Sequence, residues 1–222
     1  MGYRNILIKN KNFITLTFVS FFILCFVDMK SFGMISTEEA MLFRLLSQQV
    51  FLIFLLPLCI LSVLNQKFIQ IQKNYLVIYT NNEVLIIKNL VNLMILVQLV
   101  SYTIGQLFFG FVNYVYTGNF YIRYLNFHLV TILEIMAMSY IIVSFLLILK
   151  KNLFVFTVYY VLILLLLVYN NGYISIPMTV KNIHLLSDTT FQLFLSRVVW
   201  IFVSFISFRV SLIWYKNCFY EE

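Results

Sequence analysis

Glu134 and Arg197 stand well inside long apolar runs, where an unpaired charge is costly. Glu134 is the one carboxylate within the run at 128–149, and Arg197 lies at a similar distance from the start of the run at 191–214. A charged side chain in such surroundings pairs with an opposite charge or faces a polar cavity. The sequence suggests two arrangements: a Glu134–Arg197 pair that gates the outer half of a helix bundle, or a Glu134 carboxyl bonded to Thr131 and nearby hydroxyls.

Residues for nucleotide or metal chemistry do not occur in the required patterns. No G-x-x-x-x-G-K-[ST] motif is present, and none of the six glycines precedes a lysine. His128 and His184 are far apart and form no H-E-x-x-H pattern. The three cysteines have no short spacing. We therefore expect no catalytic site, no metal site and no cofactor bound by this chain, which would not be an enzyme.

The composition indicates whether the chain folds in water or in a lipid membrane. Of 222 residues, 63% are hydrophobic and 10% charged, and the mean hydropathy is +0.97. Soluble domains are about 45–50% apolar and about 25% charged. The net charge of +7 forms no basic stripe with interleaved exposed aromatics, so nucleic acid is not an expected partner. These values predict an all-α membrane protein with a single transmembrane domain over residues 1–222.

Apolar runs along the chain predict six transmembrane helices. A helix needs about 20 apolar residues to cross the hydrocarbon core. The runs cover residues 13–27, 45–64, 90–115, 128–149, 153–168 and 191–214. The first and fifth runs are short and would need flanking residues to span.

The lysines and arginines predict the orientation of these helices. If the N-terminus is inside, ten of them are cytoplasmic: Arg4, Lys9, Lys11, Lys67, Lys73, Lys88, Lys150, Lys151, Arg209 and Lys216. Five are then outside: Lys30, Arg44, Arg123, Lys181 and Arg197. Basic residues favour the cytoplasmic side, so both termini are expected inside.

The segment at 65–89 is the largest predicted cytoplasmic feature. Its residues 66–78 mix apolar and polar side chains in the manner of an amphipathic element lying on a membrane or a partner. Thr80 and Glu83 have the spacing of a capping box. A helix over 81–115 would be about 52 Å long and would protrude into the cytoplasm.

Two further segments have a distinct composition. Residues 1–12 are basic and amphipathic before the first apolar run. Residues 169–190 contain Gly172 and Pro177 together with apolar side chains, which predicts a short re-entrant or interfacial helical element outside, between helices five and six.

This layout resembles the ABC-2 type permeases of Gram-positive bacteria. The resemblance covers the whole chain and is carried by the stretch at 51–58 around Pro57, by the stretch at 75–88 from Tyr75 to Lys88, and by the apolar break before the last helix. It implies the ABC-2 (type V exporter-like) fold, a location in the bacterial plasma membrane, and assembly of two permeases, as two copies or with a sister permease.

The family likeness also implies a partner, a docking surface and a substrate class. The segment between helices two and three would dock on an ATP-binding subunit, which would hold ATP and Mg²⁺. The docking residues implied here are Gln66, Lys67, Gln70, Lys73, Tyr75, Thr80 and Glu83. Compact members of the family, such as lantibiotic immunity permeases and phenol-soluble modulin exporters, handle amphipathic peptides. Contacts with membrane lipids are expected throughout.

Two other classes stay open. Glu38-Glu39 and Arg44 are similar to the E-E-x-x-x-R signature of CAAX-type intramembrane proteases, whose later motifs contain histidines, as at His128 and His184. The spacing differs by one residue, which rotates Arg44 by about 100° on a helix. A membrane immunity protein that sequesters a toxin without transport is the other alternative.

Overall fold

The computed structural model describes residues 11–31, 55–64, 83–118, 125–149, 151–169 and 190–219. Every regular element within these ranges is an α-helix. The helices are α2 (Lys11–Ser31), α4 (Leu56–Val63), α6 (Glu83–Thr117), α7 (Leu125–Leu149), α8 (Asn152–Tyr169) and α9 (Thr190–Phe219). The prediction of an all-α chain is confirmed for this part of the sequence.

Each of these helices coincides with one of the apolar runs. The helix expected over 81–115 is observed as α6, which has 35 residues. The run at 153–168 becomes α8, with 18 residues. The run at 45–64 is described only from residue 55 onward, where α4 has 8 residues. The remainder of that run lies outside the described residues.

Local sequence explains where several helices begin and end. Pro57 occupies the first turn of α4, the place in a helix where its missing N–H costs nothing. Gly118 follows α6 with a φ of 68°, and its N–H donates to the Tyr114 carbonyl at 2.8 Å. That left-handed conformation is favourable for glycine, and it satisfies a carbonyl at the helix end.

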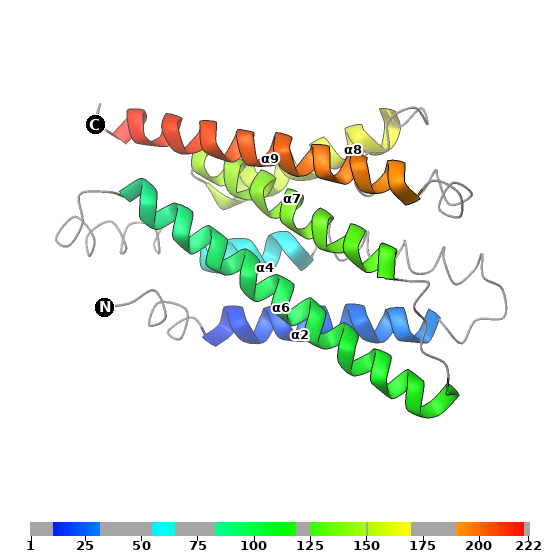
Figure 1. Cartoon of the computed structure of the whole chain (residues 1–222). Coiled ribbons are helices and arrows are strands. Elements are labelled where there is room, and N and C mark those ends of the chain that lie inside the picture. The colour runs from blue at the N-terminus through cyan, green and yellow to red at the C-terminus, as the bar shows by residue number, and fades with distance from the viewer. Residues whose placement is uncertain are drawn as a thin grey trace.

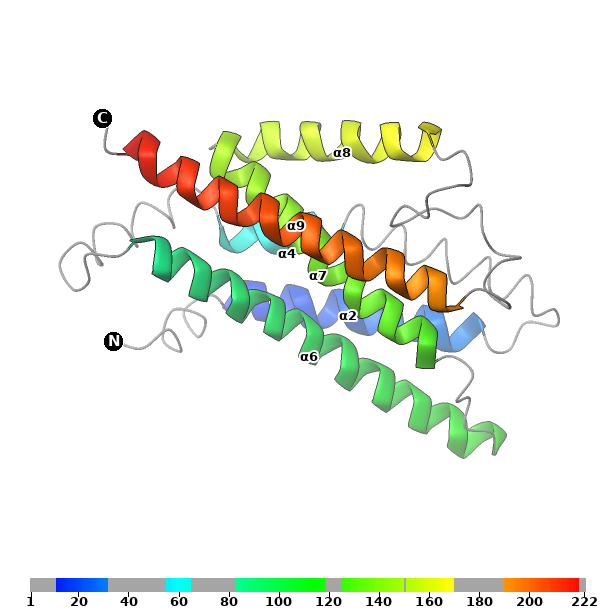
Figure 2. The same cartoon turned by 45° about the horizontal axis from the view of Figure 1, so that its top comes forward.

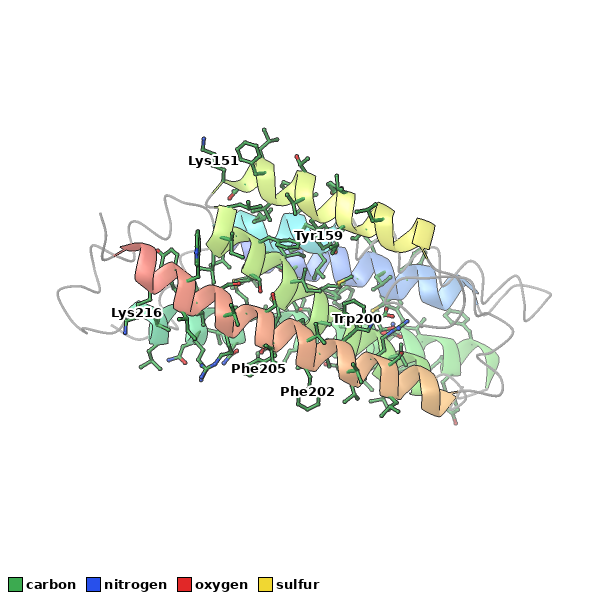
Figure 3. The ribbon with its side chains drawn as sticks, turned by 90° about the horizontal axis from the view of Figure 1, so that it is seen from above. Lys151, Tyr159, Trp200, Phe202, Phe205 and Lys216 are labelled. Atoms are coloured by element: carbon green, nitrogen blue, oxygen red, sulfur yellow. The ribbon has the colours of Figure 1, made fainter. Side chains whose placement is uncertain are left out.

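From α6 onward the helices alternate in direction along the chain, and α2 runs the same way as α6. In Figure 1, α2 and α6 run from the left side to the right, whereas α7 and α9 run from right to left. Figure 2 shows α8 returning in the direction of α2 and α6. The start of α2 and the end of α9 therefore lie at the same end of the molecule, and Figure 3 places Lys151 and Lys216 toward that end as well.

The helices form two groups. The most extensive packing is between α7 and α9, and the next most extensive is between α2 and α6. Helix α8 packs on α7, and the short α4 bridges α2 and α7. Contact between α6 and α7 is much smaller. Both views show α7, α8 and α9 on one side of the molecule and α2 with α6 on the other (Figures 1 and 2).

Within the described ranges, three helices are long and apolar enough to cross a membrane. Their apolar windows are Ile87–Tyr116, Leu129–Leu149 and Leu195–Lys216, and shorter apolar helices cover Ile14–Phe26 and Asn152–Ile163. In α7, 61% of the window is buried, against 28% in α6 and in α9. Helix α7 is thus the central helix, and the outer faces of α6 and α9 offer apolar surface suited to lipid.

Candidate functional site

The structure brings Glu134 and Arg197 together. Arg197 Nε donates to Glu134 Oε1 at 2.6 Å, from α9 to α7. Both residues are buried, with 5% and 4% exposure. Arg197 Nη1 also donates to Ser196 Oγ at 3.3 Å. A short charge-assisted hydrogen bond of this kind is how two buried charges stabilise each other.

The helix geometry explains why residues 63 positions apart meet. Helices α7 and α9 run in the same direction (Figure 1). Glu134 lies nine residues after the start of α7 and Arg197 seven residues after the start of α9. At 1.5 Å per residue these positions are about 13 Å and about 10 Å along their helices, which is nearly the same level.

Aromatic packing holds α7 and α9 together beyond the ion pair. The Tyr140 ring lies 5.6 Å from the Phe205 ring in an edge arrangement and 5.3 Å from the Phe208 ring. Phe208 is fully buried, whereas Phe202 points away from the bundle (Figure 3). Tyr140 is therefore the main aromatic residue of α7 in this contact.

Side-chain hydrogen bonds connect α7 to α6. Ser139 Oγ donates to Gln98 Oε1 at 3.0 Å, and the Tyr140 hydroxyl donates to Asn92 Oδ1 at 3.3 Å. Gln98 and Ser139 are buried. In apolar surroundings no water competes for these hydrogen bonds. Such contacts therefore help to fix which helix faces pack together.

Close packing between α2 and α6 centres on Cys25. A Cβ added at Gly105 would lie 2.7 Å from Cys25 Sγ, so only glycine fits there without a shift. Cys25 Sγ lies 3.7 Å from the Tyr102 carbonyl oxygen, and the Phe21 and Tyr102 rings are 6.1 Å apart. Cys59 of α4 is buried like Cys25, and its Sγ lies 3.9 Å from Ser20 Oγ of α2.

The predicted docking residues fall almost entirely outside the described part of the chain. Gln66, Lys67, Gln70, Lys73, Tyr75 and Thr80 lie there, together with the segments 1–10 and 170–189. Glu83 is the first residue of α6. The capping box of Thr80 and Glu83 and the docking surface therefore stay predictions.

The residues of the protease alternative are also outside this part, apart from His128 on α7. Glu38, Glu39, Arg44 and His184 are not described. Within the described ranges, no group of three or more histidine, cysteine or acidic residues is placed to hold a metal ion.

Reasoning from the sequence missed the polar link between α6 and α7. Gln98 and Asn92 are amide residues inside an apolar run, and such residues in a predicted span are candidates for contacts between helices. Ser139 and Tyr140 carry no comparable signal, since serine and tyrosine are frequent in this chain.

No protein-family model, no curated protein and no solved structure matches this chain. The described residues show an all-helical protein with apolar helices long enough to cross a membrane, a buried ion pair between α7 and α9, and a polar contact between α6 and α7.

Proposed function

We propose that this chain is the permease subunit of an ATP-driven transporter that exports or expels amphipathic peptides across a bacterial plasma membrane. Six spans with both termini inside, the ABC-2 fold and a pair of permeases belong to the same proposal. ATP and Mg²⁺ would be bound by a partner subunit, because this sequence has no phosphate-binding motif.

The directions of the five long helices carry the proposal. Helices α2, α6 and α8 run one way and α7 and α9 the other, so the chain connections fall at two opposite ends (Figures 1 and 2). The end that holds Lys151 and Lys216 also holds the start of α6 (Figures 1 and 3). A cytoplasmic placement of that end agrees with the preference of basic residues for the cytoplasm.

The length of helix α6 supports a mechanical connection to the ATP-binding subunit. With 35 residues it is about 52 Å long, well beyond the roughly 30 Å hydrocarbon core. Its first residue, Glu83, is itself one of the residues proposed for the docking surface. A force applied to that segment would reach the bundle through one continuous helix.

The buried ion pair supports a gate. In the proposed topology the starts of α7 and α9 face outside, so Glu134 and Arg197 lie in the outer half of the bundle. A charge pair in a low-dielectric setting strongly favours one arrangement of its two helices. Separation of α7 from α9 near this level would open an outward path for an amphipathic peptide.

Affinity purification from native membranes tests the proposal. A tagged chain is expected to co-purify with a protein that carries a G-x-x-x-x-G-K-[ST] motif and hydrolyses ATP. Reversal of the charges at Lys67 and Lys73 to glutamate should abolish this association. The same reversal at Lys150 and Lys151, in the other predicted cytoplasmic turn, is the matched control and should leave it intact.

Two outcomes would overturn the proposal. One is purification of the intact chain with no ATP-binding partner, which would favour the immunity alternative. The other is equal loss of the partner in both pairs of variants, since general basic charge would then explain the binding.

A further inference from the structure

An exposed arginine lies inside the apolar stretch of α9. Arg209 is seven residues before Lys216, the residue that ends the apolar window of this helix. At 1.5 Å per residue the Arg209 Cα is therefore about 10 Å inside the window. Its side chain is exposed on the outside of the bundle, unlike that of Arg197. A charge at such a depth needs an opposite charge or a path to water.

The described part of the chain supplies no opposite charge for Arg209. No hydrogen bond or ion pair of Arg209 occurs among the described residues. Helix α9 contains no acidic residue, and Glu83, the one acidic residue of α6, is the first residue of that helix. Glu134, the one acidic residue of α7, is already paired with Arg197. These three helices therefore leave the charge of Arg209 unbalanced.

The direction of α9 works against contact between Arg209 and the nearer membrane surface. The Cα–Cβ bonds of a helix tilt toward its N-terminus. Arg209 is nearer to the C-terminal end of α9, so this tilt carries its side chain toward the middle of the apolar window. To reach headgroups at the C-terminal end, the long side chain has to bend back against the tilt. An anionic group held on the protein surface would pair with Arg209 more easily.

Polar groups of α6 and α7 lie at the same level as Arg209. The Tyr140 ring contacts Phe205, one turn before Arg209, and the Tyr140 hydroxyl donates to Asn92 Oδ1 of α6 at 3.3 Å. The start of α6 and the end of α9 lie at the same end of the molecule (Figure 1). From that end, Asn92 is about 8 Å inside the apolar window of α6 and Arg209 about 10 Å inside that of α9. Asn92 and Arg209 are thus at similar depths on the two sides of Tyr140.

Two lysines extend this positive region toward the end of the molecule. Lys88 is half-buried and lies one turn before the exposed amide of α6, and Lys216 is exposed and lies two turns after Arg209. Figure 3 shows Phe202, Phe205 and Lys216 on the same side of α9. Residues four and seven positions apart share a helix face, so Arg209 belongs to this side as well. Basic and exposed apolar side chains therefore adjoin on one face of α9.

We propose that Lys88, Asn92 and Arg209 bind the phosphate of an anionic phospholipid in the leaflet at the C-terminal end of α9. The two cations donate N–H groups to phosphate oxygens, and Asn92, whose Oδ1 accepts from Tyr140, offers its Nδ2 to the same oxygens. The acyl chains lie along exposed apolar side chains of α9 such as Phe202. In the proposed topology this is the cytoplasmic leaflet, whose surface is negative. Such a site requires no transport activity.

A second copy of this chain is a poorer occupant of the same face. A two-fold contact places like residues opposite each other. The charged residues of α9 are Arg197, Arg209 and Lys216, all basic. Two Arg209 side chains brought together in a low-dielectric setting would repel each other. A phospholipid, in contrast, supplies both the negative charge and the apolar chains that this face lacks.

Fluorescence quenching by brominated lipids tests the site on the full chain in vesicles. The two tryptophans, Trp200 and Trp214, are replaced by phenylalanine, and Phe202→Trp places one reporter at an exposed position two turns before Arg209. A lipid held at Arg209 keeps its brominated acyl chain beside that reporter. Brominated phosphatidylglycerol should bind there about five-fold more tightly than brominated phosphatidylcholine, as expected for one cation near an anionic headgroup.

Variants of the reporter chain separate the site from general basic charge. Arg209→Gln should bring the ratio of the two affinities close to one, and Asn92→Leu should lower it about two-fold by removing one donor. Lys151→Gln is the matched control and should leave the ratio unchanged, because Lys151 lies at the same end but over the Phe154 ring of α8. In detergent without anionic lipid, Arg209→Gln should unfold near the wild-type temperature, so a lost preference would not reflect a damaged fold.

Three results would overturn the inference. The first is equal binding of the two brominated lipids to the reporter chain. The second is an equal drop of the ratio in Arg209→Gln and Lys151→Gln. The third is protection of the reporter by an amphipathic peptide with a free C-terminal carboxylate but not by its amidated form, since Arg209 would then bind peptide. None of these results bears on whether an ATP-binding subunit associates with the chain.

Discussion

Arg197 and Glu134 form an ion pair of 2.6 Å between the two most extensively packed helices of the structure, with both side chains removed from solvent. Loss of one partner of a buried pair typically costs about 3–5 kcal/mol, because the remaining charge stays buried.

The first prediction concerns this pair. Glu134→Gln and Arg197→Gln should each lower the thermal unfolding midpoint of the purified protein markedly, and a charge swap of both residues should restore part of the loss. Arg209→Gln is the matched control, because Arg209 is on the same helix but exposed, and it should change the midpoint little. If both single variants still transport peptide as the wild type does, the pair is not a gate.

The second prediction concerns the close approach of α2 and α6. Gly105→Ala places a Cβ 2.7 Å from Cys25 Sγ and should destabilise the protein by about 1–3 kcal/mol. Adding Cys25→Ala removes the obstructing sulfur and should recover much of that loss. Gly110→Ala, where a Cβ meets nothing within 4 Å, should be neutral or slightly stabilising. Equal effects at the two glycines, measured by thermal unfolding in the same detergent, would contradict the packing described here.

The third prediction separates two roles of Tyr140. Tyr140→Phe removes only the 3.3 Å bond to exposed Asn92 and should cost less than about 1 kcal/mol. Tyr140→Ala also removes the ring contacts with Phe205 and Phe208 and should cost clearly more. The loss should stay below the roughly 3–5 kcal/mol of soluble cores, since lipid is as apolar as the bundle. Equal costs for the two variants in unfolding experiments would show that the hydroxyl dominates.

The fourth prediction tests the six spans. In a background without cysteine, single cysteines at Lys67 and Lys150 should react with a membrane-impermeant maleimide only after the cells are opened. A cysteine at Lys181 should react in intact cells. Labelling of position 67 from outside would contradict the proposed orientation, and labelling of all three from one side would contradict the single span proposed between positions 150 and 181.

The helices were the most predictable part of the structure. The stretch between Glu83 and Gly118 is mostly apolar, contains no proline and has Lys88 as its one charged residue, and the boundaries of α6 agree with the expected helix to within two residues. The Lys150–Lys151 break likewise predicts the turn between α7 and α8. Helix propensity and hydrophobicity are local properties, and a single sequence contains them in full.

The contacts between helices were less predictable. The meeting of Glu134 and Arg197 was one of two alternatives, because it required α7 and α9 to be neighbours that run in the same direction. The link from Ser139 to Gln98 was missed altogether. Which faces of uniformly apolar helices pack together depends on side-chain shape, such as the space at Gly105, and this chain has little polar patterning that would indicate it.

Site-specific photo-crosslinking tests the central claim most directly. A photoreactive phenylalanine analogue at Gln70, in living cells, should form a covalent adduct with an ATP-binding subunit. The same analogue at Tyr116, an exposed residue near the other end of α6, should not. A well-expressed chain whose Gln70 position captures no ATP-binding protein, or captures it no better than Tyr116 does, would contradict the assignment as a permease.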